Sequence, residues 1–216
     1  TRRPHQGGDQ ALGAGHGELC DAAILNLDLR GFTPFAAKAP PDAVMALLAD
    51  YQTRMVPLIR KHGGSIDKFL GDGILATFGA ASKSPTYASD ALHALDEIMI
   101  EVAAWSESYS GKDGYRPKVN GAVAAGRVLF GVIGAADRLE YTVIGEAVNL
   151  SAKLEKANKT VFANALCDGP TFDLACAQGY RPKPGQTRLA DVQVAGVEAA
   201  LDLVVLAAGA TQDTAS

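Results

Sequence analysis

The stretch Gly63-Gly64-Ser65-Ile66-Asp67-Lys68-Phe69-Leu70-Gly71-Asp72-Gly73-Ile74-Leu75-Ala76-Thr77-Phe78 decides how this chain folds. Two apolar runs flank its central Gly-Asp-Gly. Asp-Gly between strand-like runs is a strong hairpin signal, because glycine accepts the positive φ that tight turns need. The sequence therefore predicts a β-hairpin with Asp72 in its turn. Most aspartates in such turns serve the turn alone.

A second segment, residues 22–35, indicates that Asp72 has a chemical role beyond the turn. It reads as a buried strand that ends in Asp28, followed by a glycine turn and a helix start with Thr33 as N-cap and Pro34 at the first helical position. Free backbone N–H groups at such a turn favour phosphate. If the hairpin lies beside this strand, Asp28 and Asp72 converge, and converging carboxylates favour divalent cations. The residues alone thus favour a two-metal nucleotide site.

Three motifs of the chain together resemble the successive signatures of the class III nucleotidyl (adenylate/guanylate) cyclase catalytic domain. They are Asp28-Leu-Arg-Gly-Phe-Thr, then Lys68-Phe-Leu-Gly-Asp72-Gly, then Tyr141-Thr142-Val-Ile-Gly-Glu-Ala-Val-Asn149. Any one of them would be a weak signal, but their common order and spacing are specific. The resemblance covers most of the chain, from the first strand to the last.

The resemblance implies an adenylate cyclase, which converts ATP to cyclic 3′,5′-AMP and pyrophosphate. The 3′-hydroxyl attacks the α-phosphate of the same nucleotide, so the protein mainly positions groups and stabilises charge. Two Mg²⁺ or Mn²⁺ ions per site are implied, with Asp28, Asp72 and the carbonyl of Leu29 as ligands. The implied contacts to the β and γ phosphates are the N–H groups of Arg30, Gly31, Phe32 and Thr33.

Base and ribose contacts are also implied by the resemblance. Lys68 suits adenine, because an ammonium can donate to the adenine N1 acceptor, and Thr142 can accept from the adenine amino group. Asn149 matches the asparagine that orients the ribose. Lys153 stands one helical turn further on, where the family usually has an arginine that braces the transition state. Lysine keeps the charge but loses the planar fork, so reduced catalysis is expected.

Two further positions depart from the family pattern. Asn120 stands where a phosphate-binding arginine is common, and Ala195 stands before Gly196 where a basic residue is frequent. These departures keep a second interpretation open. The chain could be a catalytically weak cyclase-homology module that binds nucleotide or pairs with a partner. A guanylate cyclase is disfavoured by Lys68, and a diguanylate cyclase by the absence of a Gly-Gly-Asp/Glu-Glu-Phe turn.

Lys68 and Asp72 also bear on assembly. Four residues of extended chain span roughly 13 Å, so one chain cannot easily direct both side chains into one pocket. The family solution is a head-to-tail homodimer with two sites, each of which combines metal ligands from one subunit with base and ribose contacts from the other. This chain carries both sets, so it can be self-complementary. An upstream sensor could act by moving the subunits relative to each other.

Bulk properties place the chain among soluble globular domains. Its 216 residues are 48% hydrophobic and 20% charged, with a net charge of −4. The acidic balance argues against a nucleic-acid partner, and no apolar stretch is long enough to span a bilayer. Cys20, Cys167 and Cys176 have no metal-ligand spacing, so reduced thiols in a cytoplasmic protein are expected. The start at Thr1 favours a fragment of a longer protein.

The predicted fold is α+β: a ferredoxin-like βαββαβ core with extra strands, in a mostly antiparallel sheet with helices on one face. The catalytic domain is expected over residues 19–207, between a disordered linker, 1–18, and a disordered tail, 208–216. The expected elements are listed in chain order: strand 21–28, a helix from Pro41 to Gly63, hairpin strands 65–70 and 73–79, helix 86–109, strands 118–125 and 127–133, strand 139–144, helix 146–157, strand 160–164, helix 170–177, and strands 187–194 and 199–206.

Overall fold

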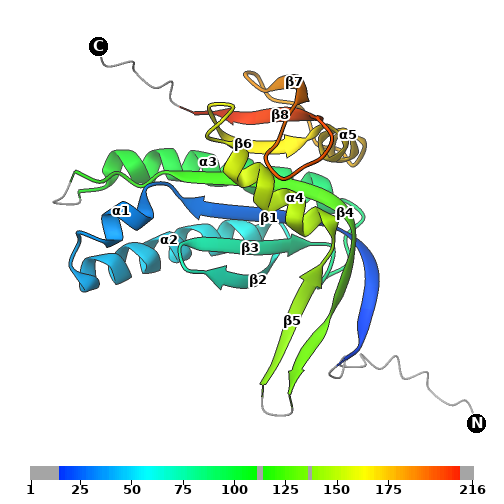
Figure 1. Cartoon of the computed structure of the whole chain (residues 1–216), viewed down its shortest axis with the longest axis horizontal. Coiled ribbons are helices and arrows are strands. Elements are labelled where there is room, and N and C mark those ends of the chain that lie inside the picture. Colours follow the sequence, from blue (N-terminus) through cyan, green and yellow to red (C-terminus); the bar gives the residue numbers. More distant parts are fainter. Residues whose placement is uncertain (1–14, 111–113, 136–137, 210–216) are drawn as a thin grey trace, which may run out of the picture.

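The computed structural model describes residues 15–110, 114–135 and 138–209, and the predicted linker and tail lie largely outside these ranges. The described chain forms one eight-stranded mixed sheet with helices packed against it (Figure 1). Its elements are listed in chain order: β1 (Gly17–Leu29), α1 (Phe32–Ala36), α2 (Pro41–Lys61), β2 (Ser65–Leu70), β3 (Gly73–Phe78), α3 (Tyr87–Ser108), β4 (Val119–Ala135), β5 (Arg138–Ile144), α4 (Glu146–Ala157), β6 (Ala163–Asp168), α5 (Gly169–Ala177), β7 (Thr187–Val192) and β8 (Leu201–Ala208).

The predicted hairpin is present and lies beside β1. The sheet order is β2-β3-β1-β4-β6-β8-β7, with β5 paired to β4, and only the β4–β6 pair is parallel. Gly71 has a φ of 62°, which is the left-handed conformation that the turn requires. The predicted α+β fold with a mostly antiparallel sheet is therefore confirmed.

The helices cover both faces of the sheet, whereas the sequence pattern predicts them on one. α2, α3 and α5 pack on one face, where alternate residues of β1 (Leu25, Leu27, Leu29) join the main core. α4 packs on the other face, against Ala22 and Ile24 (Figure 1). The alternation along β1 explains the difference, because both sets of side chains are apolar and each needs a cover.

β4 is a single strand from Val119 to Ala135, and the expected break at Gly126 was wrong. Thirteen consecutive residues of β4 pair with β1, from Val119 to Gly131. Gly126 sits within this ladder opposite Ala22, where a Cβ would lie 3.4 Å from the Cβ of Ala147, so this glycine is part of a continuous strand and forms no turn. β1 likewise begins at Gly17, four residues earlier than expected.

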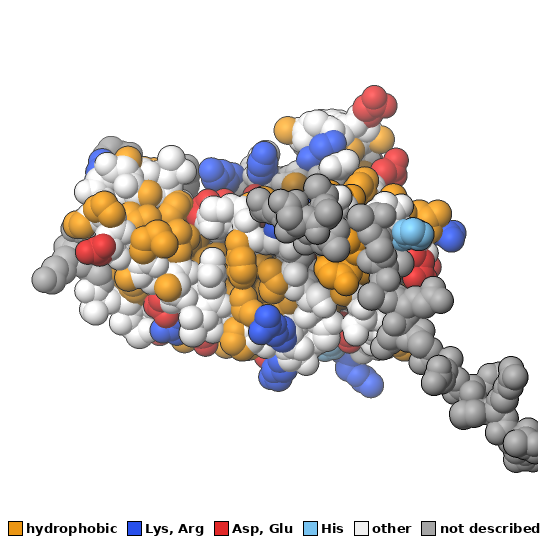
Figure 2. All heavy atoms as spheres, turned by 90° about the horizontal axis from the view of Figure 1, so that it is seen from below, with side chains coloured by type: hydrophobic (Ala, Val, Ile, Leu, Met, Phe, Trp, Pro, Cys, Tyr) orange, Lys and Arg blue, Asp and Glu red, His pale blue; other side chains and the backbone are white. Residues whose placement is uncertain are grey.

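The far half of β4 and its partner β5 project from the body of the molecule as an arm (Figure 1). We define the β-arm as residues 127–135 and 138–144. Several large apolar side chains on it are exposed, listed here with their exposed fractions: Leu129 40%, Ile133 51%, Tyr141 57% and Ile144 56%. Figure 2 shows hydrophobic side chains in patches on the lower surface of the molecule. An exposed apolar arm is typical of an interaction surface.

Gly121 provides a test of the packing between the sheet and α3. A Cβ at this position would lie 2.4 Å from Cδ1 of Leu95 and 3.1 Å from Cδ2 of Leu27, and both leucines are fully buried. Gly121→Ala should therefore lower the free energy of unfolding by about 1–3 kcal/mol, as overpacked cores do. Chemical denaturation measures the change.

The matched control is Gly126→Ala in the same strand, where the new Cβ would meet Ala147 at an ordinary 3.4 Å. This variant should stay within about 1 kcal/mol of the parent, since alanine also gains strand propensity over glycine. Equal destabilisation by the two variants would contradict the packing of α3 against Gly121.

Candidate functional site

Asp28 and Asp72 meet at the end of β1. The antiparallel register pairs Asp28 with Gly73, so the hairpin turn lies directly beside the last residues of β1. The N–H of Leu29 donates to the carbonyl of Asp72 at 3.4 Å, which ties the turn to the strand. Both carboxylates line a cavity of about 560 Å³, here called the acidic cavity. The other lining residues are Leu29, Arg30, Gly31, Phe32, Thr33, Pro34, Asn120, Glu155, Lys156 and Lys159.

The two carboxylates interact strongly. Burial, the charge of Asp72 and the charge of Glu155 raise the pKa of the Asp28 carboxyl to about 7, and a hydrogen bond between the two aspartates contributes in the same direction. Lys159 offsets part of this effect. Burial also raises the pKa of Glu155, against the hydrogen bond that it receives from Asn120. Three carboxylates thus share the acidic cavity with three cations, and burial together with the neighbouring negative charges disfavours the ionisation of Asp28.

This arrangement fits a divalent cation. Converging carboxylate oxygens are the hard donors that Mg²⁺ and Mn²⁺ take, and a cation between them would remove the repulsion. Within residues 15–110, 114–135 and 138–209, no cluster of three or more His, Cys, Asp or Glu side chains has the geometry to hold a metal. Two aspartates would thus leave coordination positions for water, backbone carbonyl or phosphate oxygens.

Three residues of the acidic cavity were missed by the sequence analysis: Glu155, Lys156 and Lys159. They come from α4 and the segment after it, which lie over the same sheet face as Asp28. Ser151 and Glu155 are one helical turn apart, and Ser151 accepts a hydrogen bond from Asn26 of β1 at 3.0 Å. That polar stripe on α4 was the available signal. Asn120, noted earlier as a departure, pairs with Asp28 across β1 and β4 and is 2% exposed.

The turn after β1 differs in two details from its prediction. Gly31, with a φ of 68°, is the N-cap of α1, so Thr33 lies inside the helix and makes no capping hydrogen bond. The left-handed glycine closes the turn earlier than a threonine cap would. The N–H of Arg30 is also committed, since it donates to the carbonyl of Lys118 at 2.8 Å. The N–H groups of Gly31, Phe32 and Thr33 stay without a hydrogen-bond acceptor among the described residues.

Lys68 and Thr142, the two residues predicted to contact the adenine base, lie next to each other. Lys68 Nζ is 3.5 Å from Thr142 Oγ1, and it forms an ion pair with Asp67 at 3.1 Å. A β-bulge between Ile66 and Lys68 makes this possible, because it lets the consecutive residues Asp67 and Lys68 face each other. Thr142 comes from the β-arm and is 8% exposed.

Asn149 and Lys153 lie on α4 at a distance from the two aspartates. Asn149 is exposed, and Lys153 donates from Nζ to the carbonyl of Gly196 in the β7–β8 connection. Lys153 thus approaches the place where Ala195 replaces a basic residue of the family. None of Lys68, Thr142, Asn149 and Lys153 lines the acidic cavity. The structure therefore separates the predicted metal ligands from the predicted base, ribose and transition-state contacts.

Comparison with known proteins places the chain in a family. Residues 17–161 match the family described as the adenylate and guanylate cyclase catalytic domain. The chain belongs to this family of class III nucleotidyl cyclase domains. It is similar to an adenylate cyclase of Anabaena cylindrica, with 30% identity over 187 residues, 83% of this chain and 35% of that protein. An uncharacterized protein of Mycobacterium tuberculosis is 34% identical over 160 residues, 74% of this chain and 28% of that protein.

Solved structures agree with this assignment. The guanylyl cyclase Cya2 matches with a TM-score of 0.76 and 28% identity, covering 92% of this chain and 97% of that one. The adenylyl cyclase CyaB from P. aeruginosa shares the fold with a TM-score of 0.72 at 22% identity, covering 92% and 98%. The chain spans about a third of the length of the curated relatives. Among the described residues, no helix is long and apolar enough to cross a membrane.

The carboxylate pair makes a prediction about metal-free stability. A raised pKa means that native Asp28 binds protons that the unfolded chain has released, so the free energy of unfolding falls as pH rises from about 4 to 7. Asp72→Asn removes the like charge and should make this fall shallower. Without metal at pH 7.5 the variant should be at least as stable as the parent, as measured by thermal unfolding.

The same variant should lose its response to Mn²⁺. Saturation at about 100 times Kd stabilises a protein by about 2.7 kcal/mol, which raises the parent Tm by several degrees. Asp21→Asn, an exposed carboxylate of the same strand, is the matched control and should keep the full response. A Mn²⁺ response that survives in Asp72→Asn would exclude this cavity as the metal site.

Proposed function

We propose that this domain is an adenylate cyclase, which forms cyclic AMP and pyrophosphate from ATP. The observation that carries the proposal is the convergence of Asp28 and Asp72 in one cavity, beside the free N–H groups that follow β1. Adenine selectivity is supported by the contact between Lys68 and Thr142. One named relative is an adenylate cyclase and one matched structure is a guanylyl cyclase, so the choice of base rests on this chain's own residues.

The residues of the acidic cavity would act on the triphosphate. Two Mg²⁺ or Mn²⁺ ions, bound by Asp28, Asp72 and the Leu29 carbonyl, would lower the pKa of the 3′-hydroxyl and neutralise phosphate charge. The N–H groups of Gly31, Phe32 and Thr33 would orient the β and γ phosphates. Lys156 and Lys159 add positive charge at the rim, which partly takes the place of a cation at Asn120.

A complete site requires two copies of the chain. Lys68, Thr142, Asn149 and Lys153 lie outside the acidic cavity of their own subunit, although they would bind the same nucleotide. A head-to-tail dimer, in which these residues face the aspartates of the other subunit, brings both sets together. The β-arm supports this arrangement, because its exposed apolar side chains surround Thr142 and would be buried by a second copy.

A second function is favoured by one observation. Asn120 is buried in the acidic cavity where a positive charge would contact phosphate, and its amide is occupied by Glu155. A domain that binds nucleotide weakly and serves as a regulatory dimerisation module would tolerate this substitution. The intact aspartate pair favours the enzyme. In a longer protein, an upstream sensor would control either activity through the dimer.

The proposed activity is tested with the purified chain, Mn²⁺ or Mg²⁺, and ATP or GTP. Cyclic AMP should form from ATP with Mn²⁺, and Asp72→Ala should reduce the rate to background, because the cation site is lost. Sedimentation measured in parallel should show a dimer. A dimer that binds Mn²⁺ but makes neither cyclic nucleotide would support the regulatory module instead. An excess of cyclic GMP would contradict the role of Lys68 while leaving the cyclase assignment intact.

Lys153 gives a prediction about rate. Arginine would restore a bidentate fork at the transition-state phosphate, and one additional charge-assisted hydrogen bond corresponds to roughly a tenfold change in rate. Lys153→Arg should therefore raise kcat about tenfold and leave KM for ATP nearly unchanged. Lys38→Arg, at an exposed position outside the acidic cavity, is the control and should change kcat little. A rise in KM without a rise in kcat would place Lys153 outside the reacting group.

A further inference from the structure

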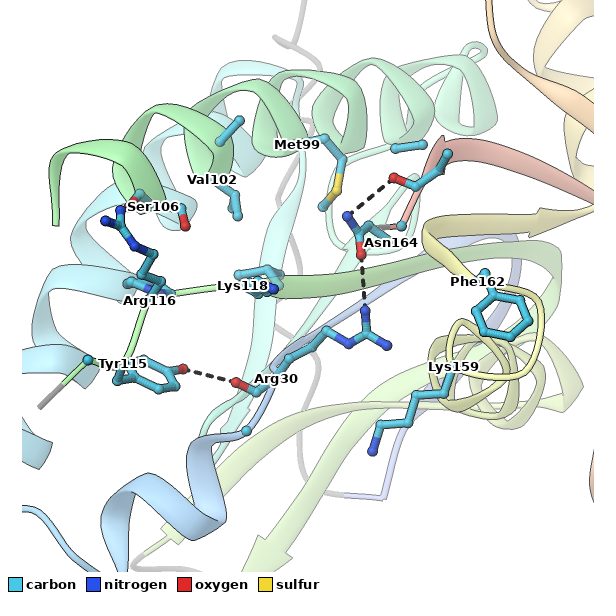
Figure 3. A pocket seen from close by; sticks show the side chains of 18 residues that line it. Arg30, Met99, Val102, Ser106, Tyr115, Arg116, Lys118, Lys159, Phe162 and Asn164 are labelled. Carbon is cyan, nitrogen blue, oxygen red and sulfur yellow. Dashed lines mark hydrogen bonds between the residues drawn. The ribbon is translucent and has the colours of Figure 1, made fainter. Parts of the chain in front are cut away.

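A second cavity, of about 1020 Å³, lies beside the acidic cavity and is lined by positive charge. We call it the basic cavity. Its charged residues come from three places: Arg30 after β1, Arg116 and Lys118 before β4, and Lys159 after α4 (Figure 3). Its other described lining residues include no Asp or Glu. Four cations therefore meet no carboxylate among the described lining residues, although the net charge of the chain is −4.

The charges of the basic cavity are only partly offset by the described part of the chain, since Arg30 and Lys159 also act on the nearby Glu155 carboxylate. None of the four cations forms an ion pair with the described part of the chain. Arg30 and Arg116 contact only neutral groups: Arg30 donates to Asn164 Oδ1 at 3.2 Å, and Arg116 donates to the carbonyl of Ser106 at 2.9 Å. Neutral partners orient a guanidinium without cancelling its charge. The cavity therefore has a positive potential that an anion would relieve.

The position of Arg30 is fixed by a short network that has no role in the proposed reaction. Tyr115 donates its hydroxyl proton to the carbonyl of Arg30 at 3.0 Å, and Asn164 donates to the carbonyl of Ala208 at 3.4 Å (Figure 3). The Arg30 side chain is thus directed toward β6 and into the basic cavity, rather than folded back over Asp28. Preorganised donors of this kind bind anions at low entropic cost.

Part of the lining is apolar and includes a strained aromatic residue. Met99 and Val102 of α3 line one side, and Phe162 lies beside Lys159 (Figure 3). Phe162 is 56% exposed and has a φ of 53°, a left-handed conformation that bulky residues rarely adopt. Its carbonyl accepts from the N–H of Gly209 at 2.8 Å, which holds the backbone in place. Backbone strain that exposes an aromatic ring often serves ligand binding.

We infer that the basic cavity is a second ligand site, which binds a polyphosphate anion in addition to any nucleotide held at the aspartates. The four cations match several phosphate oxygens, and the apolar wall with Phe162 can hold a base. A second nucleotide and an inorganic polyphosphate, such as the pyrophosphate product, share this chemistry. Arg30 and Lys159 also line the acidic cavity, but Arg116, Lys118 and Phe162 line the basic cavity alone. The inference therefore does not depend on the proposed reaction.

The test measures binding by calorimetry in EDTA, with tripolyphosphate and ATP as probes. The full chain carrying Asp72→Ala should bind both, since the basic cavity needs no metal. Lys118→Glu in that background should weaken the binding of both probes roughly tenfold to a hundredfold, as expected for the loss of a charge-assisted contact. Lys118 is exposed, so the variant is expected to fold, and circular dichroism checks this.

The control is Arg181→Glu, which reverses an exposed charge outside both cavities and should leave binding unchanged. Phe162→Ala identifies the source of the ligand. A loss of affinity for ATP alone, relative to the chain with Phe162, supports a nucleotide, and unchanged affinities for both probes support an inorganic polyphosphate. Absence of binding in the Asp72→Ala chain, or equal weakening by Lys118→Glu and Arg181→Glu, would overturn the inference. Each result is independent of whether cyclic AMP is formed.

Discussion

The repulsion between Asp28 and Asp72 is the constraint on which the functional end of this domain depends. Backbone pairing of β1 with β3 forces the hairpin turn against the end of β1, so the sheet itself determines the distance between the carboxylates. Burial, the charge of Asp72 and the charge of Glu155 all increase the cost of ionising Asp28. The two hydrophobic cores must therefore stabilise a cavity that is unfavourable by itself at neutral pH. Such a cavity is preorganised for a cation, because the unfavourable energy is released on binding.

The same sheet explains why one chain holds two incomplete halves of a site. β2 and β5 carry Lys68 and Thr142 to one region, where the bulge at Asp67 completes their contact. β1 and the hairpin turn carry the aspartates to another. A sheet cannot bend back within a few residues to join these regions, but a symmetric partner can supply the missing half of each. The exposed apolar surface of the β-arm is consistent with this need.

Local patterns were sufficient for much of the fold. Asp-Gly between apolar runs predicted the hairpin, and helical spacing predicted α2 and α3 to within about two residues, because these signals lie within a few residues of sequence. The same patterns gave a wrong prediction for β4, because the sequence around Gly126 does not distinguish a glycine within a continuous strand from a glycine in a turn. Glu155 and Lys159 were missed as well, because the polar stripe on α4 does not by itself show what it faces. Their place beside Asp28 depends on which sheet face α4 covers, and that is decided by the long-range alternation of β1.

The two cavities are physically linked, because Arg30, Gly31 and Lys159 line both of them. The charge of Lys159 acts to lower the pKa of Asp28, against the larger raising effect of burial, so Lys159 influences the acidic cavity. An anion bound in the basic cavity would offset the positive charge of Arg30 and Lys159, and the electrostatic potential in the acidic cavity would become more negative. A divalent cation would then bind there more tightly, and by reciprocity the cation would strengthen the binding of the anion by the same factor. Cation and polyphosphate would thus act on each other through two shared side chains, without any change in the fold.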